Sequence, residues 1–151
     1  MRPAHCPPTP DLEIWIPGNP VPKGRSRSVL IRGVVRNLTP KKTRAAEASI
    51  ATLVRAHLGP GWKVDTESNW TLAYEFHCQS QVRGDGDNLQ KLAQDALQGV
   101  LFADDRRVTV WHGKIASEAS QSPGTRIQAW RSDRKSGIKP QAPLSAHLGS
   151  C

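Results

Sequence analysis

The chain has 151 residues, of which 21 are Lys or Arg and 13 are Asp or Glu, so its formal net charge at pH 7 is +8. About one domain is expected at this length, and the 37% of hydrophobic residues can supply one modest core. No apolar run approaches the roughly 18 residues of a membrane span, and residues 1–10 lack the pattern of a secretory signal. We therefore expect a cytoplasmic protein and exclude a membrane protein.

The cysteines exclude two further classes. Cys6, Cys78 and Cys151 are odd in number and far apart, which leaves neither a disulfide framework nor a Cys-x-x-Cys zinc site. We expect Cys78 to be a small buried hydrophobic residue.

The first half of the chain predicts a strand, a hairpin and a helix. Residues 12–16 alternate apolar and polar side chains and stop at Pro17-Gly18, as a strand that enters a turn does. Residues 20–27 form a proline-flanked basic loop, and residues 29–38 are β-branched around Arg32-Gly33, which favours a hairpin or a second strand. A helix is then predicted up to residue 58.

That helix has signals at both ends. Thr39 is expected as the N-cap and Pro40 as the first helical residue, and Gly59-Pro60 supplies the stop. Residues at helical spacing mark its apolar face: Ile50, Leu53, Val54, His57 and Leu58.

The second half predicts a strand, a helix and two more strands. Residues 70–78 alternate strictly and give the clearest strand. The next helix is expected to be capped by Asp87 or Asn88 and to end before Gly99. Strands follow at residues 108–116 and 125–130. The fold class is therefore α+β, a mixed sheet with two main helices packed on it in a single small domain.

The acidic residues are concentrated in one segment. Residues 85–105 contain five acids and one base, Lys91, which leaves 20 basic and 8 acidic residues for the rest of the chain. The five acids are Asp85, Asp87, Asp95, Asp104 and Asp105. Such a segment in a basic chain is typical of a protein that binds a polyanion and holds a metal ion at its centre.

The spacing of these acids predicts how they hold a metal. Asp85 and Asp87 are two apart in what we expect to be an extended approach to the helix, so their side chains point the same way. Asp104 or Asp105 reaches the same place only if the strand that follows lies beside the strand of residues 70–78. Three carboxylates would then suit Mg²⁺ or Mn²⁺, and phosphodiester hydrolysis is the natural reaction.

Simpler interpretations of each motif stay open. The Asp-Gly-Asp-Asn motif can be only a turn with a helix cap, and Asp104-Asp105 can be a loop tip. Lys91 follows Asp87 by one helical turn and can either stabilise phosphate charge or form an ordinary ion pair with Asp87 or Asp95.

The residues carry a resemblance to a known family. Residues 85–91, with Asp95-Ala96-Leu97 and residues 99–105, resemble the core of the RusA family of Holliday junction resolvases. Residues 18–25 and 38–44 resemble the basic entry loop and helix start of its phage-type members. The resemblance covers about residues 12–130.

The resemblance implies a homodimeric, Mg²⁺-dependent endonuclease that binds four-way DNA junctions and nicks two strands symmetrically. The family's catalytic and metal-binding acids fall on Asp85, Asp87 and Asp105, with Asp104 as the alternative ligand, and its essential lysine falls on Lys91. A phage or prophage origin and bacterial cytoplasm follow from the same resemblance.

The sequence also predicts the domain limits and the DNA contacts. We expect a flexible N-terminus at residues 1–11, a RusA-like domain at residues 12–131 and a flexible basic tail at residues 132–151. The candidate phosphate contacts, each of which can also be a merely solvated charge, are Lys23, Arg25, Arg27, Lys41, Lys42, Arg44 and Arg83.

The five tryptophans are expected in two kinds of environment. Trp15, Trp70, Trp111 and Trp130 fall in strand patterns and are expected in the core or a dimer interface, whereas Trp62 can stack on a base.

Besides the junction-resolving nuclease, two other hypotheses are kept: a metal-dependent nuclease for flaps or duplex DNA, and a noncatalytic basic DNA-binding module.

Overall fold

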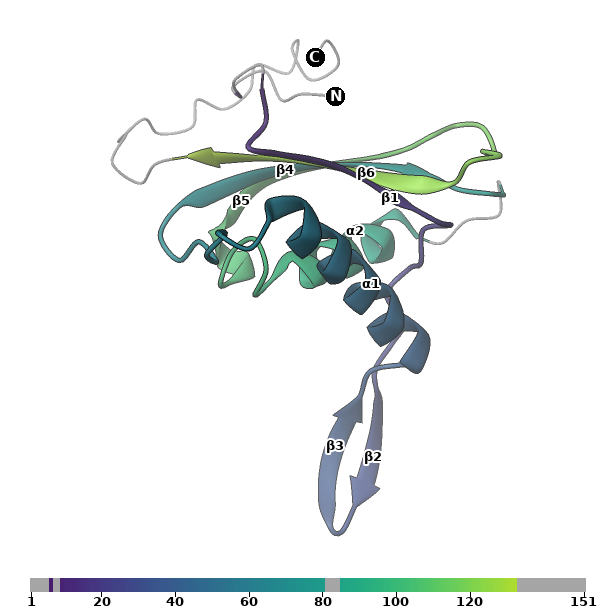
Figure 1. Ribbon diagram of the computed structural model, residues 1–151. Helices are drawn as coiled ribbons and strands as arrows, with labels where there is room; N and C mark the ends of the chain where they lie inside the picture. The colour runs from purple at the N-terminus through teal and green to yellow at the C-terminus, as the bar shows by residue number, and fades with distance from the viewer. Residues whose placement is uncertain (1–5, 7–8, 81–84, 133–151) are drawn as a thin grey trace.

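The computed structural model describes residue 6, residues 9–80 and residues 85–132. Within these, a four-stranded sheet carries two helices on one face, and a separate two-stranded hairpin projects away from the body (Figure 1). The α+β fold and the predicted order of elements are confirmed. The candidate residue Arg83 and most of both predicted flexible ends lie outside the described residues.

The sheet has the strand order β1-β6-β4-β5. β1 (Leu12–Pro17) and β4 (Asn69–His77) both pair antiparallel with β6 (Gly124–Ser132), and β5 (Val108–Ile115) pairs parallel with β4. The parallel pair is joined by a helix, as parallel neighbours require. β1 and β5 are therefore the two edges of the described sheet.

The central strand β4 is buried on both faces. Its alternating residues Trp70, Leu72, Tyr74 and Phe76 join the main core, in agreement with the predicted pattern. On the other face Ala73 packs with Trp130 and Cys6, all buried. Thr71 on this second face is buried too, so β4 is covered on both faces although its sequence alternates. Cys78 is buried, as expected.

Helix α1 (Lys41–Leu58) begins later than predicted. Pro40 is the N-cap and no side chain caps the helix, so the expected capping bond from Thr39 is wrong. The end is as predicted, with Gly59 at a φ of 84°. Ile50, Ala51 and Val54 are buried, but Leu53 and His57 face solvent because the stripe toward the sheet is narrower than the spacing suggested.

Helix α2 (Gly86–Leu97) connects β4 to β5 and carries an apolar stripe at helical spacing. All five of its stripe residues are buried: Leu89, Leu92, Ala93, Ala96 and Leu97. Its N-cap is Asp85, not Asp87 or Asn88. A short 3₁₀ helix, η1 (Asp105–Arg107), leads from the loop after α2 into β5.

The predicted hairpin is present as β2 (Arg27–Ile31) and β3 (Val34–Leu38). Arg32 and Gly33 form its turn with φ angles of 51° and 79°. Two positive φ angles are what a tight turn between right-twisted strands requires. The hairpin alternative to a second strand is thus confirmed.

The strand tryptophans divide into two pairs. Trp70 and Trp130 are buried, whereas Trp15 is 42% and Trp111 is 55% exposed. The core interpretation is therefore wrong for Trp15 and Trp111, since both lie on edge strands. Trp62 packs partly against the core and its indole N–H donates to the Val100 carbonyl. None of the described helices is long and apolar enough to cross a membrane.

Packing of β1 on β6 predicts a stability difference between two glycines. A Cβ on Gly124 would lie 2.2 Å from Trp15 Cζ2 and 2.7 Å from the Ile16 carbonyl oxygen, whereas one on Gly61 would meet nothing within 4 Å. We expect Gly124→Ala to lower the free energy of unfolding by about 1–3 kcal/mol through overpacking. Gly61→Ala should change it by less than about 0.5 kcal/mol. Urea unfolding of both variants checks this, and equal values would contradict the packing.

Candidate metal centre and nucleic-acid surface

Two carboxylates gather at the N-terminal end of α2. Asp85 caps the helix, its Oδ1 accepting from the Asp87 amide at 3.2 Å, and its carbonyl accepts from the amides of Asn88 and Leu89. The approach is therefore not extended through Asp87, which already lies in the first turn. Both acids nevertheless sit at the same helix end and both are exposed. Free amides and the helix dipole stabilise negative charge there.

Lys91 follows one turn later and is exposed. Among the described residues no ion pair joins it to Asp87 or Asp95. Asp95 instead pairs with Lys23 of the entry loop, and the Lys23 amide donates to the Asn88 carbonyl at 2.9 Å. The ordinary helical ion pair considered for Lys91 is thus not formed, and the entry loop is fastened to α2.

The Lys23–Asp95 pair lies between the two helices, beside Glu47 of α1. Burial raises the pKa of Glu47, Asp95 raises it further and Lys23 lowers it. Burial and Asp95 also raise the pKa of Tyr74, which lies beneath in the core. Lys23 therefore neutralises an acidic cluster of the protein itself, which reduces its availability to DNA phosphates.

The second acid pair lies at the other end of the sheet. Asp104 and Asp105 precede the start of β5, where Val108 pairs with Trp70 at the start of β4. Gly86 instead lies near the end of β5, where a Cβ on it would be 3.4 Å from Ile115 Cδ1. The two acid pairs are thus separated by the length of β5, on the order of 25 Å.

This separation corrects the expected closure of the metal site. β5 does lie beside β4, as the expectation required, but its parallel direction takes Asp105 away from Asp85 and Asp87. In the described part of the chain, no three Asp, Glu, His or Cys residues come together in a way that could hold a metal ion. One chain supplies two carboxylates at one place and two at another.

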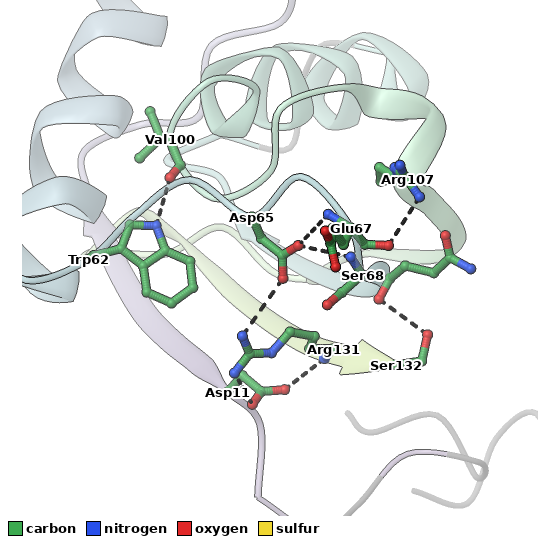
Figure 2. A network of polar contacts seen from close by, with 10 residues as sticks. Asp11, Trp62, Asp65, Glu67, Ser68, Val100, Arg107, Arg131 and Ser132 are labelled. Atoms are coloured by element: carbon green, nitrogen blue, oxygen red, sulfur yellow. Dashed lines mark hydrogen bonds and ion pairs between the residues drawn. The ribbon is translucent and has the colours of Figure 1, made fainter. Parts of the chain in front are cut away.

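The segment around Asp104-Asp105 is held by polar contacts to residues 62–67 (Figure 2). Trp62 donates to the Val100 carbonyl at 2.9 Å, and the Ala103 amide donates to the Asp65 carbonyl at 2.9 Å. After the acids, Arg107 Nη1 donates to the Glu67 carbonyl at 3.0 Å. The acid pair is therefore fixed on both sides.

Asp104 and Asp105 differ in what they contact. Asp104 caps η1, its Oδ1 accepting from the Arg106 amide at 2.9 Å. That amide lowers the pKa of the Asp104 carboxyl, desolvation raises it, and a hydrogen bond with the Asp105 side chain and the charge of Arg106 lower it further. Asp105 is the more exposed of the two. Asp104 thus caps the start of η1, whereas Asp105 keeps the more exposed carboxylate.

Asp65 is the anchor of the network in Figure 2. Its Oδ1 accepts from the Glu67 and Ser68 amides, each at 2.8 Å, and Oδ2 lies 3.7 Å from Arg131 Nη1. Burial raises the pKa of Asp65, but the hydrogen bonds from Ser68 and Glu67 and the charge of Arg131 together lower it below its ordinary value. Arg131 in turn pairs with Asp11.

The remaining basic candidates are free of the core. Five described residues are exposed: Arg25, Arg27, Lys41, Lys42 and Arg44. The sequence reasoning missed Arg32 and Arg36 on the hairpin, which are also exposed. A signal for them existed, because residues 18–46 contain eight basic residues and no acidic one.

Comparison with known proteins decides the family. A family model described as endodeoxyribonuclease RusA matches residues 17–129. The chain belongs to the RusA family. RusA proteins are endodeoxyribonucleases, hydrolases that act on Holliday junctions, and nucleases of this kind generally need a divalent metal ion. No curated protein matches the chain.

The matched region contains every candidate acid and Lys91. The RusA resemblance seen in the sequence is therefore confirmed, whereas the roles of individual residues stay predictions. The described fold gives those roles a geometry, with two carboxylates at the start of α2 and two at the start of β5.

The Asp65 network predicts a pH-dependent stability. A carboxyl whose pKa is lowered by folding stabilises the native state above its unfolded pKa of about 3.9, and this stabilisation is lost as pH falls through the lowered value. We expect Asp65→Asn to cost about 1–2 kcal/mol at pH 7, and the difference from the parent to shrink at pH 3. Urea unfolding at both pH values measures this, with the exposed neighbour Glu67→Gln as control. A difference that is the same at both pH values would contradict the assignment.

Proposed function

We propose that this chain resolves four-way DNA junctions by paired symmetric nicks, as a metal-dependent endonuclease of the RusA family. The observation that carries the proposal is the family match over residues 17–129, which spans both acid pairs and Lys91. Net charge of +8 supports a polyanionic substrate.

We assign Mg²⁺ as the metal, with Mn²⁺ as a substitute, because the donors are carboxylate oxygens. Mg²⁺ is commonly held by one or two carboxylates together with substrate phosphates, which fits Asp85 and Asp87. When bound there, a divalent cation supplies a polarised phosphate oxygen and a water of lowered pKa. Lys91 projects from the next turn and is proposed to stabilise charge on the phosphate.

The separation of the acid pairs favours a second copy as the source of Asp105. β5 is an edge strand, and two β5 strands paired about a two-fold axis would run antiparallel. The start of one would then lie beside the end of the other, where Gly86 packs near Ile115. Asp105 of the second copy would thereby approach Asp85 and Asp87 of the first.

Trp111 supports the same pairing. It lies near the middle of β5, on the helix-covered face with its partner Leu72, and it is 55% exposed. An exposed Trp on an open strand edge is typical of a surface that contacts another protein chain. At this position Trp111 would lie close to the two-fold axis. The homodimer is thus a proposal from strand direction and exposure together.

DNA contacts are proposed for the exposed basic side chains near α2 and at the start of α1. Arg25 and Arg27 follow the fastened entry loop, and Lys41, Lys42 and Arg44 begin α1. Arg83 stays a candidate, and Lys23 is proposed as a structural residue that holds the loop. A bacterial cytoplasm, with a phage or prophage gene, is the setting that the family suggests.

Cleavage assays test the function directly. We expect paired nicks in a labelled four-way junction with Mg²⁺ or Mn²⁺, none with a chelator, and little cleavage of a matched duplex or flap. Asp87→Asn should lower the rate by about a hundredfold or more, because several kcal/mol of transition-state stabilisation depend on the metal. Glu13→Gln, on the far edge strand β1, should cleave like the parent.

Each other outcome of this assay selects a different function. Equal cleavage of junction, flap and duplex would indicate a general metal-dependent nuclease. Binding without cleavage in either metal would contradict the enzyme and leave a DNA-binding module.

Metal binding should also change the oligomeric state. If the site uses carboxylates of two chains, the cation binds the dimer better than the monomer and raises the dimer fraction by linkage. We expect Mn²⁺ to shift the monomer–dimer equilibrium in sedimentation velocity, and Asp105→Asn to remove the shift. Asp104→Asn should keep it, and the reverse result would make Asp104 the ligand. No shift in the parent chain would contradict a shared site.

A further inference from the structure

The β2–β3 hairpin exposes apolar side chains that the fold does not use. Leu30 is 72%, Val35 is 67% and Val34 is 56% exposed. The two strands pair with each other and extend away from the sheet and both helices (Figure 1). A lone two-stranded hairpin is marginally stable in water, so apolar residues at its tip bring no evident gain to the folded chain.

The hairpin's charge identifies the kind of partner. It carries Arg27, Arg32 and Arg36, and residues 18–46 around it hold eight basic and no acidic residues. Such a segment repels its own copy and attracts phosphates. Arg36 lies opposite Val29 and shares a face with Ile31 and Val34, whereas Leu30 and Val35 pair with each other on the opposite face. The tip is therefore apolar on both faces and carries charge on one of them.

The stem of the hairpin is fixed close to the candidate metal centre. The Lys23 amide is bonded to the Asn88 carbonyl, and the Gly24 amide donates to Thr43 Oγ1 at 3.0 Å. These contacts hold the entry loop between α2 and the start of α1. Five residues per strand then carry the tip on the order of 17 Å outward, enough to reach into a duplex whose phosphate lies at Asp85 and Asp87.

We propose that the β2–β3 hairpin is a wedge that inserts Leu30, Ile31, Val34 and Val35 between base pairs at the branch point of the junction. The inference rests on the proposed function and adds how the branch is recognised. Apolar side chains that enter a base step must break its stacking. At a branch point continuous stacking is already interrupted, so the cost is lowest there, while the arginines contact the flanking phosphates.

Fluorescence of 2-aminopurine beside the branch point tests the wedge. All proteins carry Asp87→Asn so that binding is measured without cleavage. We expect the parent to raise the fluorescence several-fold, because unstacked 2-aminopurine is brighter, and to leave a probe in the duplex arms unchanged. Leu30→Ser with Val35→Ser should lose more than half of the rise at saturating protein.

A matched control removes exposed apolar residues elsewhere. Leu53→Ser with Val64→Ser, both on the body and 39% and 38% exposed, should keep the full rise. Far-ultraviolet circular dichroism and thermal unfolding compare the folding of both double variants. A full rise with the hairpin variant would overturn the wedge, as would a hairpin variant that lost its effect only by becoming monomeric in sedimentation.

The native chain separates failure of the wedge from failure of the function. Junction cleavage by the native chain without any fluorescence change in the Asp87→Asn parent would overturn the wedge alone. Absence of both junction binding and junction cleavage would overturn the wedge together with the proposed function.

Discussion

The parallel pairing of β4 with β5 determines where the chemistry of this chain lies. Because α2 carries the chain back across the sheet before β5 begins, Asp85 and Asp87 lie at one end of the βαβ unit and Asp105 at the other. The same pairing leaves β5 as an open edge with Trp111 exposed on it. The proposed antiparallel contact between two copies would account both for two acid pairs too far apart for one metal and for the open strand edge.

Each acid pair is also held by a frame of contacts around it. At α2 the Lys23–Asp95 pair and the Lys23 amide fasten the basic entry loop against the helix. At β5 the buried carboxylate of Asp65 organises its own turn and holds Arg131, while its backbone bonds the loop that leads to Asp104. Each frame uses contacts between residues distant in sequence, so the placement of the acid pairs depends on the whole domain.

The sequence predicted the elements better than their relations. Periodicity located β4 and α2 because each buries a regular stripe, and Gly59 and Gly99 marked the helix ends. Caps were less predictable: Asp85, Asp87 and Asn88 are all good capping residues, and only the backbone decides among them. The distance between the acid pairs depends on strand direction, which no local pattern encodes. Arg32 and Arg36 were missed because residues 29–38 were used only to predict a hairpin, and the absence of acidic residues around them was not considered.

Mixing two inactive variants tests the shared site most directly. Asp87→Asn and Asp105→Asn chains are combined as monomers, allowed to associate, and assayed on a four-way junction with Mg²⁺. In a shared arrangement each mixed dimer keeps one intact site, so we predict about a quarter of the parental site activity for statistical association, mostly as single nicks. A mixture as inactive as either variant alone would contradict the account and return each site to a single chain.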